Sequence, residues 1–229
     1  MAEFSSIPLR SDANLQAYYK LENVNDDLGA NNLTNNNTVA FNAAVFGNGG
    51  DQGTSNSNKY LSTANRLNIT GGASSFAFWL KMKTDVTGTA VILFSHNDKT
   101  TNKVRFDLNY FDSSGLKLRL DRVRVGVAVD STTTYSVTLG TSLFYHICCT
   151  YDGTNLIVYL NGASVATGTS SGNGSSSTGN DGFYIGADNG GANVSSAIFD
   201  DFVVFNRALT SDEVLQIYNY SAGNFLLFL

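Results

Sequence analysis

The residues that decide the fold are 145–168, YHICCTYDGTNLIVYLNGASVATG. Within them, Asp152-Gly153 and Asn161-Gly162 bracket the apolar run NLIVYL at 155–160. Both dipeptides are typical of tight turns, because glycine readily adopts the positive φ that hairpin turns require. The stretch therefore predicts a strand with a tight turn at each end.

Alternation of apolar and polar residues continues on both sides of this stretch. Each run is short, rich in β-branched or aromatic residues and bounded by turn-forming residues, which is the pattern of an all-β sandwich. The predicted strands are 15–21, 74–83, 90–95, 103–110, 116–129, 134–139, 145–151, 155–160, 163–169, 182–187 and 197–206. About a dozen strands favour two packed sheets over a small barrel.

One helix is predicted near the end of the chain. Thr210 and Glu213 have the spacing of a capping box, in which each side chain satisfies a backbone N–H at the helix start. Val214, Ile217 and Tyr218 then share one helical face. We expect this helix to pack on an edge of the sandwich.

The chain has 229 residues, a length that an all-β sandwich often uses as one domain. We assign 13–220 to the sandwich, 1–12 to an N-terminal segment and 221–229 to an apolar tail. The tail ends in NFLLFL, which would be unfavourable in water. It can be covered by the core of its own chain or by a neighbouring subunit, and a homo-oligomer is one prediction.

Composition excludes several partner classes. Charged residues make up only 14% of the chain and the net charge is −5, so the basic patch of a nucleic-acid binder is missing. The basic stretch 117–124 alternates its charges with Leu and Val, which favours the solvated face of a strand. Without a long apolar run, membrane insertion is not expected. The neutral polar surface suits partners such as sugars.

Cys148 and Cys149 are adjacent in a predicted strand, so their side chains point to opposite faces. They are poorly placed to bridge each other, and with His146 they lack the spacing of a structural zinc site. We expect one buried thiol and one more accessible thiol. His146 is expected to be structural, and His96 to lie in a loop.

Four segments together resemble one known family. They are the opening stretch, SSFAFWLKMK at 74–83, FDDFVVFNRALTSDEVLQIYN at 199–219 and LQAYYKLENVNDDLG at 15–29. In type and order they resemble the laminin-G-like, concanavalin A-like lectin-glucanase jelly-roll family. The resemblance implies an all-β sandwich of two antiparallel sheets with one short C-terminal helix. It does not decide the ligand, because one fold hosts many functions.

Jelly-roll glucanases that resemble this family place paired acids along one strand, in a Glu-x-Asp-x-x-Glu pattern. Hydrolysis needs two carboxyl groups about 5 to 9.5 Å apart. The glutamates of this chain, Glu3, Glu22 and Glu213, do not form that pattern. With 2 histidines and no Gly-x-Ser-x-Gly motif, no catalytic residue is predicted, and the chain is not expected to be an enzyme.

The resemblance also implies one structural calcium site. The loop NDDLG at 25–29 resembles the early Asp-x-x-Gly loop of the family, and Asp200 resembles the first acid of its late Asp-Asp strand. Glu22, Asp26 and Asp200 are therefore the candidate ligands, since Ca²⁺ takes oxygen ligands, usually from loops. In the alternative interpretation, these acids only make side-chain turns or pair within the sheet.

A sugar site requires an aromatic platform beside amide or carboxylate groups. Tyr110 and Asp112 end a predicted strand, and Asp188 and Asn189 lie in the loop GADNGGANV, so these four are candidate ligand contacts. Each pair also has a plain explanation as a turn. The single tryptophan, Trp79, is expected to be buried between the sheets rather than exposed on a sheet face.

The first functional hypothesis is a non-catalytic carbohydrate-binding or adhesion module whose partner is a glycan or another cell-surface ligand. The alternative is a structural or receptor-binding component of a phage virion or a cell-surface assembly. MAEFSSIPLRSD at the start lacks the features of a secretory signal. We expect an extracellular, cell-surface or virion protein, which reaches that place after removal of a signal or by another route.

Overall fold

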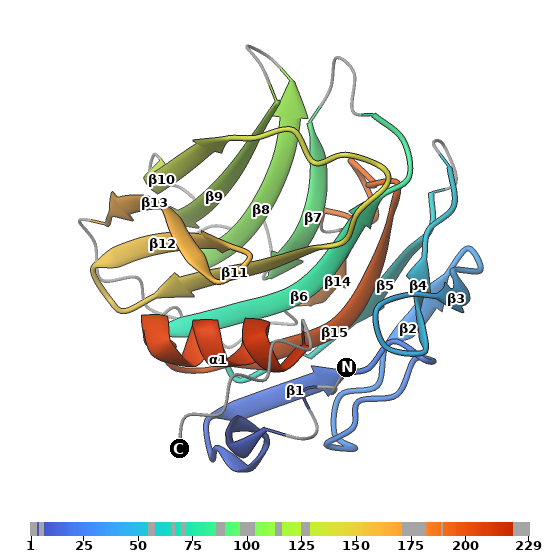
Figure 1. Ribbon diagram of the computed structural model, residues 1–229, viewed down its shortest axis with the longest axis horizontal. Coiled ribbons are helices and arrows are strands. Elements are labelled where there is room, and N and C mark those ends of the chain that lie inside the picture. Colours follow the sequence, from blue (N-terminus) through green and yellow to red (C-terminus); the bar gives the residue numbers. More distant parts are fainter. Residues whose placement is uncertain are drawn as a thin grey trace.

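The computed structural model describes residues 4, 7–54, 58–65, 67–69, 72–85, 90–96, 104–112, 116–124, 129–170, 182–188 and 190–221. In this part of the chain, two antiparallel sheets pack face to face, and one α-helix lies on the outside of the sandwich (Figure 1). The predicted all-β sandwich is confirmed.

The first sheet, sheet A, has the strand order β13-β12-β11-β6-β15-β4-β3, and β1 also pairs with β15. Its strands are β1 (Leu15–Tyr19), β3 (Ala40–Ala43), β4 (Asn48–Asp51), β6 (Ser74–Met82), β11 (Tyr145–Tyr151), β12 (Asn155–Leu160), β13 (Ala163–Thr169) and β15 (Ala197–Phe205). The β12–β13 turn has φ of 50° at Asn161 and 81° at Gly162, which confirms the predicted tight turn.

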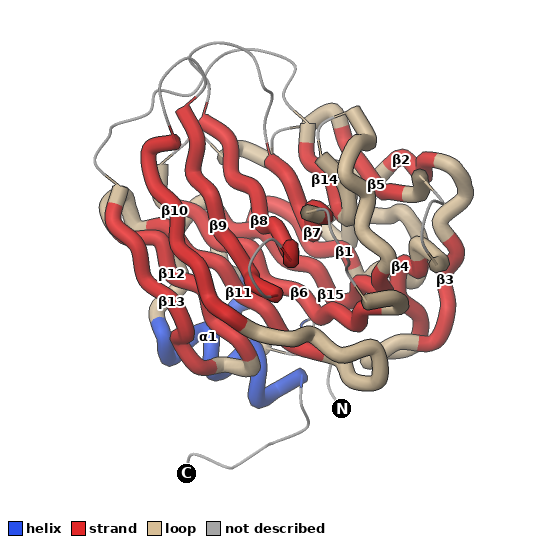
Figure 2. Tube along the Cα trace, turned by 90° about the horizontal axis from the view of Figure 1, so that it is seen from above, coloured by secondary structure: helices blue, strands red, loops and turns tan. Residues whose placement is uncertain are grey.

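The second sheet, sheet B, has the order β10-β9-β8-β7-β14-β5-β2, and Figure 2 shows these strands side by side. They are β2 (Thr34–Asn36), β5 (Tyr60–Thr63), β7 (Val91–His96), β8 (Val104–Asp112), β9 (Leu116–Arg124), β10 (Val129–Ser136) and β14 (Phe183–Ile185). The predicted strand 116–129 therefore corresponds to two strands, because residues 116–124 form β9 and Val129 is the first residue of β10. The β10 strand also includes 134–136, the first residues of the predicted strand 134–139.

Aromatic rings fill the space between the sheets. From sheet A, Phe78 stacks on Phe202 at a centroid distance of 4.6 Å, and Phe76 stacks on Phe94 of sheet B, also at 4.6 Å. Offset-stacked and edge-to-face rings at such distances add to the stabilisation that burial gives. The apolar residues of the alternating runs form this core.

The outer face of sheet A is covered by α1 (Ser211–Ser221) and by the short 3₁₀ helix η2 (Pro8–Ser11). The capping box is confirmed, because the Thr210 N–H donates to Glu213 at 2.8 Å and the Glu213 N–H donates to Thr210 at 3.2 Å. Val214 and Ile217 are buried against this outer face, so the helix packs on a face of the sandwich and not on the predicted edge. No helix in the described ranges has both the length and the apolar character to cross a membrane.

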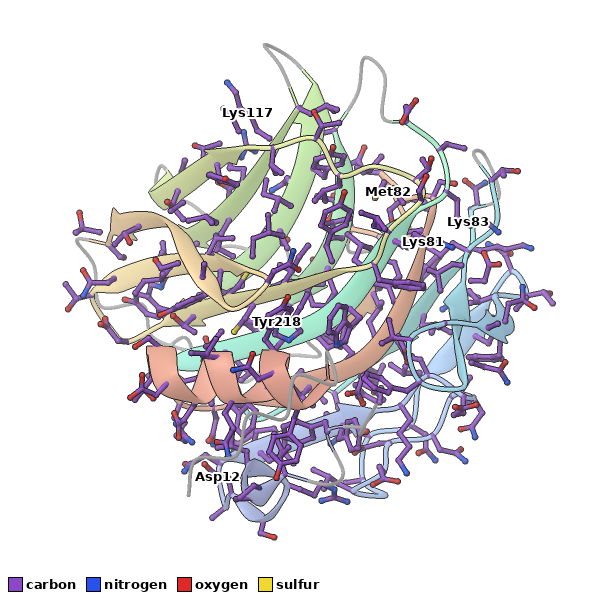
Figure 3. The ribbon with its side chains drawn as sticks, in the orientation of Figure 1. Asp12, Lys81, Met82, Lys83, Lys117 and Tyr218 are labelled. Atoms are coloured by element: carbon purple, nitrogen blue, oxygen red, sulfur yellow. The ribbon has the colours of Figure 1, made fainter. Side chains whose placement is uncertain are left out.

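This cover makes two predictions about sheet A wrong. Cys148 and Cys149 do point to opposite faces, but both thiols are buried, because α1 and the N-terminal segment cover the side that was expected to be accessible. Trp79 is buried on the same outer face rather than between the sheets. Its ring stacks on Tyr218 of α1 at 6.0 Å, and Figure 3 shows Tyr218 directed from the helix toward the sheet.

Sheet B corrects two further expectations. His96 is the buried last residue of β7 and does not lie in a loop. Arg122, inside the stretch interpreted as a solvated face, is fully buried, with its guanidinium carbon 4.7 Å from the Tyr151 ring centroid and a hydrogen bond to Ser170 at 3.1 Å. Strand alternation places Arg122 on the same face as Leu120, because the two residues are two positions apart.

Arg207 connects the N-terminal segment to α1, and its removal should destabilise the fold. Its guanidinium donates to Asp12 at 2.8 and 2.5 Å and to both carboxylate oxygens of Glu213 at 2.7 Å. We expect Arg207→Ala to lower the free energy of unfolding by about 2 kcal/mol in urea titrations. Arg10→Ala, which removes the more exposed pair with Asp27, should cost less than about 1 kcal/mol. Equal losses would contradict this ranking.

Candidate functional site

Asp26, a predicted calcium ligand, is buried in the loop that follows β1. Its Oδ1 accepts the N–H groups of Tyr18 at 3.0 Å and Leu28 at 3.1 Å, and its Oδ2 accepts the N–H of Asn31 at 3.1 Å. Both carboxylate oxygens therefore hold the loop against β1. This arrangement matches the alternative interpretation, in which Asp26 organises a turn.

The other two predicted ligands converge on one backbone segment, 45–48. Asp200 lies on β15, and its Oδ2 accepts the N–H groups of Val45 at 2.9 Å and Phe46 at 2.8 Å. Glu22 accepts the N–H of Asn48 at 3.0 Å. The two carboxylates thus fix the same segment from β15 and from the residues after β1.

Asp200 has one feature that suits a cation. It is fully buried, and its Oδ1 has no hydrogen-bond partner among the described residues. Burial raises the pKa of this carboxyl to about 8, and the charge of Asp201 adds to the rise. The hydrogen bond from the Phe46 N–H acts in the opposite direction and lowers the pKa. Calcium held by Asp200 and Glu22 would favour the ionised carboxylate and fix residues 45–48.

The full predicted set of calcium ligands is not brought together. Within the described part of the chain, no three His, Cys, Asp or Glu side chains gather as a metal site, and Asp26 is occupied by backbone N–H groups. Calcium therefore stays a prediction that depends on Asp200 and Glu22 with backbone oxygens.

The predicted ligand contacts on β8 have different positions. Tyr110 is buried in the core, where its hydroxyl accepts the N–H of Leu139 at 2.8 Å and donates to the carbonyl of Val137 at 3.5 Å. Asp112 is the last residue of β8, and its side chain lies outside the described residues. Tyr110 is therefore a core residue and not a ligand contact, and a ligand contact of Asp112 stays a prediction.

The second predicted pair lies in the loop after β14. Asp188 is buried, and its backbone closes a turn by donating to the carbonyl of Ala192 at 2.8 Å and accepting from Gly191 at 2.9 Å. Asn189 lies outside the described residues. The same loop packs on Tyr60, because a Cβ atom at Gly191 would lie only 2.4 Å from that ring. Its contact with a ligand stays a prediction.

A line of polar residues crosses the outer face of sheet B. The pairing register aligns one residue from each strand, and we call this line the polar row: Thr34, Ser62, Tyr184, Ser95, Asp107, Asp121 and Thr132. Phe106 and Leu120, next to Asp107 and Asp121 in sequence, face the core, so the polar row faces away from sheet A. With strands about 4.8 Å apart, seven strands span roughly 29 Å.

Asp121 is the centre of a hydrogen-bond network at one end of the polar row. Its Oδ2 accepts from Asn109 at 2.9 Å and from Nε of Arg119 at 2.8 Å, and its Oδ1 accepts from the Thr132 hydroxyl. Thr132 is exposed and the Arg119 side chain is 39% exposed. Asp121 thereby orients two hydrogen-bonding groups that solvent or a ligand can reach. Figure 3 shows Lys117, from the same strand, extending away from sheet A.

Two tyrosines lie toward the other end of the polar row. Tyr60 on β5 and Tyr184 on β14 are half-buried, with ring centroids 6.1 Å apart and planes inclined by 37°. Tyrosine rings offer an apolar surface with a polar edge. The outer face of sheet B therefore combines the aromatic and hydrogen-bonding groups that a sugar site requires.

Sequence analysis did not select Tyr60, Tyr184, Arg119 or Asp121 as ligand contacts. The alternation in 117–124 did predict that its charges face away from the core, as they do at Arg119 and Asp121. It could not show that Tyr60 and Tyr184, which are far from them in sequence, lie on the same face, since the strand register is not written in either segment.

Several solved structures are similar to this chain. Domain 4 of AbnA, a GH43 extracellular arabinanase from Geobacillus stearothermophilus solved with arabinotriose, has a TM-score of 0.63 and 16% identity over 91% of this chain and 100% of that chain. The binding domain of botulinum neurotoxin DC in complex with SialylT has a TM-score of 0.71 and 11% identity over 91% and 52%. The binding domain of Paraclostridial Mosquitocidal Protein 1 has a TM-score of 0.65 and 17% identity over 90% of this chain and 52% of that chain.

At these identities the likeness concerns the fold alone, and the chain spans about half the length of the two toxin domains. No curated protein matches the chain in sequence. The family model of the concanavalin A-like lectin/glucanases superfamily matches residues 53–215, which include most strands of both sheets. The chain therefore belongs to the concanavalin A-like lectin/glucanases superfamily.

Proposed function

We propose that this chain is a non-catalytic carbohydrate-binding module whose glycan-binding surface is formed by the accessible groups along the polar row, Tyr184 with Tyr60 and Thr132 with Arg119. The other members Ser95, Asp107 and Asp121 are buried and are not proposed as contacts. The observation that carries the proposal is the placement of Tyr60 and Tyr184 on the same sheet face as Arg119 and Thr132. The arabinanase domain solved with arabinotriose and the neurotoxin domain solved with SialylT support a glycan ligand. An extracellular or cell-surface location belongs to the same proposal.

Hydrolysis is the second function that the outer face raises, because Asp107 and Asp121 are directly opposite each other on β8 and β9. A pair of nearby carboxyl groups is what a glycosidase needs. Asp107 is fully buried, however, and Asp121 is 4% exposed with three donors on its oxygens. This favours a structural role. A reducing-end assay with arabinan or glucan tests this. Activity of the wild type that is lost in the Asp107→Asn variant would support catalysis instead.

Removing the ring of Tyr184 should weaken glycan binding. We expect Tyr184→Ala to lower affinity for glycans bound by the wild type about ten-fold, equivalent to roughly 1.4 kcal/mol, because the sugar loses its apolar platform. Tyr184→Phe keeps the ring and should stay within about three-fold. A glycan array that includes arabinotriose and sialylated glycans would identify the ligand, and calorimetry would measure each affinity.

Tyr220→Ala is the matched control for this experiment. Tyr220 is also a half-buried tyrosine, but it lies on α1 at the outer face of sheet A, on the other side of the sandwich. Its loss should leave glycan affinity unchanged. An array without any bound glycan, or equal losses for both alanine variants, would refute the proposed surface.

The alternative, a component of a phage virion or surface assembly, was based on the lack of secretory-signal features at the start of the sequence, the lack of an appended enzyme and the apolar tail 221–229. Residues 222–229 lie outside the described residues, so this hypothesis and the predicted homo-oligomer stay predictions. Light scattering after size-exclusion chromatography would test both, with a strictly monomeric species counting against them.

A further inference from the structure

An open cavity of about 280 Å³ lies beside β1 and shares no described residue with the polar row. Its walls come from β1, from the loop after β1 and from the segment after β5. The described lining residues are Gln16, Asn31, Asn65, Leu67 and Asn68. We call this cavity the amide groove, because all of these residues except Leu67 carry a side-chain amide.

Asn31 holds the walls of the amide groove in place. Its backbone N–H donates to Asp26 at 3.1 Å, and its carbonyl accepts the hydroxyl of Tyr19 at 2.8 Å. Its side chain donates to the carbonyl of Gln16 at 3.1 Å and accepts from Asn65 at 3.0 Å. The groove is therefore shaped before any ligand arrives, which lowers the entropy that binding must overcome.

The wall after β5 has an unusual backbone. Leu67 and Asn68 both lie in the left-handed region, with φ of 50° and 51°. Asparagine tolerates this conformation, but for leucine it costs on the order of 1–2 kcal/mol. Burial of Leu67 in the core offsets that cost, and the conformation keeps Asn68 at the groove. Strain of this kind is concentrated at binding and active sites.

The amide groove has hydrogen-bonding capacity that the fold does not use. Neither the Gln16 nor the Asn68 side-chain amide forms a hydrogen bond with a described residue, and among these residues the Asn65 side-chain amide donates only to Asn31. A primary amide has two N–H donors and a carbonyl acceptor. Donors and acceptors are therefore offered together at the groove.

This lining selects the chemical class of the ligand. None of the described lining residues is charged, and the carboxylate of nearby Asp26 already accepts backbone N–H groups. An anion would lack a cationic partner, and a cation would lack a carboxylate. Hydroxyl groups, which donate and accept at once, match neighbouring amides.

We propose that the amide groove binds one residue of a neutral oligosaccharide, as a second glycan site distinct from the polar row. The volume is at the lower limit of ordinary ligand pockets, about 300 Å³, which fits one sugar residue better than a long chain. This inference extends the proposed function to a second place on the same module.

Isosteric amide-to-carboxylate variants test the inference. Gln16→Glu and Asn68→Asp keep the shape of the side chain, so they create no steric clash with a sugar hydroxyl. Each variant removes two N–H donors and introduces a negative charge. We expect each to lower affinity for maltotriose or cellotriose about ten-fold in calorimetric titrations. Sialyllactose, an anionic probe, should bind the groove of the wild type at least about ten-fold more weakly than the neutral trisaccharides.

Gln216→Glu is the matched control. Gln216 is half-buried like Gln16 and receives the same charge, but it lies on α1. The affinity of the Gln216→Glu variant for the neutral trisaccharides should stay within about two-fold of the wild type. Side-chain amide signals in NMR spectra give a readout that needs no variant: those of Gln16 and Asn68 should shift on addition of a neutral trisaccharide.

The outcomes separate this inference from the proposed function. Sensitivity to Gln16→Glu with shifted Gln16 and Asn68 signals supports the groove, whether or not Tyr184→Ala also weakens binding. If Tyr184→Ala weakens binding while the groove variants and the amide signals remain unchanged, the second site is refuted and the polar row stands. If no neutral trisaccharide binds and no amide signal moves, the groove inference fails as well.

Discussion

Replacing Asp200 with asparagine is expected to make the protein more stable at pH 8 and to remove most of the change in stability between pH 4 and 8. Burial raises the pKa of Asp200 from 3.8 to about 8, so the folded chain retains a proton that the unfolded chain has released. Stability from this carboxyl is complete below pH 3.8 and is lost as pH rises through about 8. At about 1.4 kcal/mol per unit of pKa, a pKa that rises from 3.8 to about 8 gives an expected loss of about 5 kcal/mol between pH 4 and pH 8.

Asparagine is neutral at every pH and can still accept the N–H groups of Val45 and Phe46. Urea unfolding in the presence of a chelator, at closely spaced pH values, measures the difference between the two proteins. Asp152→Asn is the control: the N–H groups of Asn155 and Thr154 lower the pKa of Asp152, so its effect should appear only at acid pH. A wild type whose stability stays constant from pH 4 to 8 would show that Asp200 ionises normally.

Calcium should reverse the behaviour of the wild type at pH 8. A cation beside Asp200 stabilises the ionised carboxylate, and binding to the folded state alone raises stability with the logarithm of ligand excess. At a hundred-fold excess over the dissociation constant the gain is about 2.7 kcal/mol. Asp200→Asn and Glu22→Gln should gain much less. Equal melting temperatures of the wild type with calcium and with chelator would end the calcium prediction.

The parts of the fold that were predicted from sequence have strong local patterns. The turn at Asn161-Gly162 requires positive φ at both positions, and the helix that starts at Ser211 has a complete capping box. The β2, β3, β4 and β5 strands were not predicted. TNN at 34–36 and NGGD at 48–51 have no apolar alternation, and β5 has only four residues. They form because neighbouring strands supply pairing partners, a tertiary effect.

The candidate sites were harder to predict, because their parts depend on contacts between distant segments. Acidic residues at Asp26 and Asp200 were visible, but sequence could not show that backbone N–H groups 5 and 154 positions away would occupy their oxygens. Likewise, the polar row is assembled by strand register, and Cys148 is buried because α1 and the N-terminal segment cover the outer face of sheet A. The type of a residue indicated which interactions its side chain can make, whereas the packing of distant segments decided which interactions it does make.

Acidification should destabilise the protein through His146. The ring is buried, and neither nitrogen has a hydrogen-bond partner among the described residues. Burial lowers its pKa from 6.5 to about 3, so between these values the unfolded chain binds a proton that the folded chain does not. Stability from this group is therefore lost as pH falls below about 6.5. The expected loss by pH 4 is about 2–3 kcal/mol.

His146→Phe should remove this acid sensitivity. The phenyl ring can keep the contacts with Trp79 and Tyr218, whose centroids lie 5.3 and 5.9 Å from the imidazole, and it eliminates two buried nitrogens without partners. We expect a gain of about 1 kcal/mol at pH 7 that grows at lower pH. Because carboxylates also titrate in acid, the informative quantity is the difference between variant and wild type at each pH. A difference that stays constant from pH 7 to 4, or an NMR titration of His146 in the folded protein with a midpoint near 6.5, would mean that the imidazole is hydrated and that burial does not control its charge.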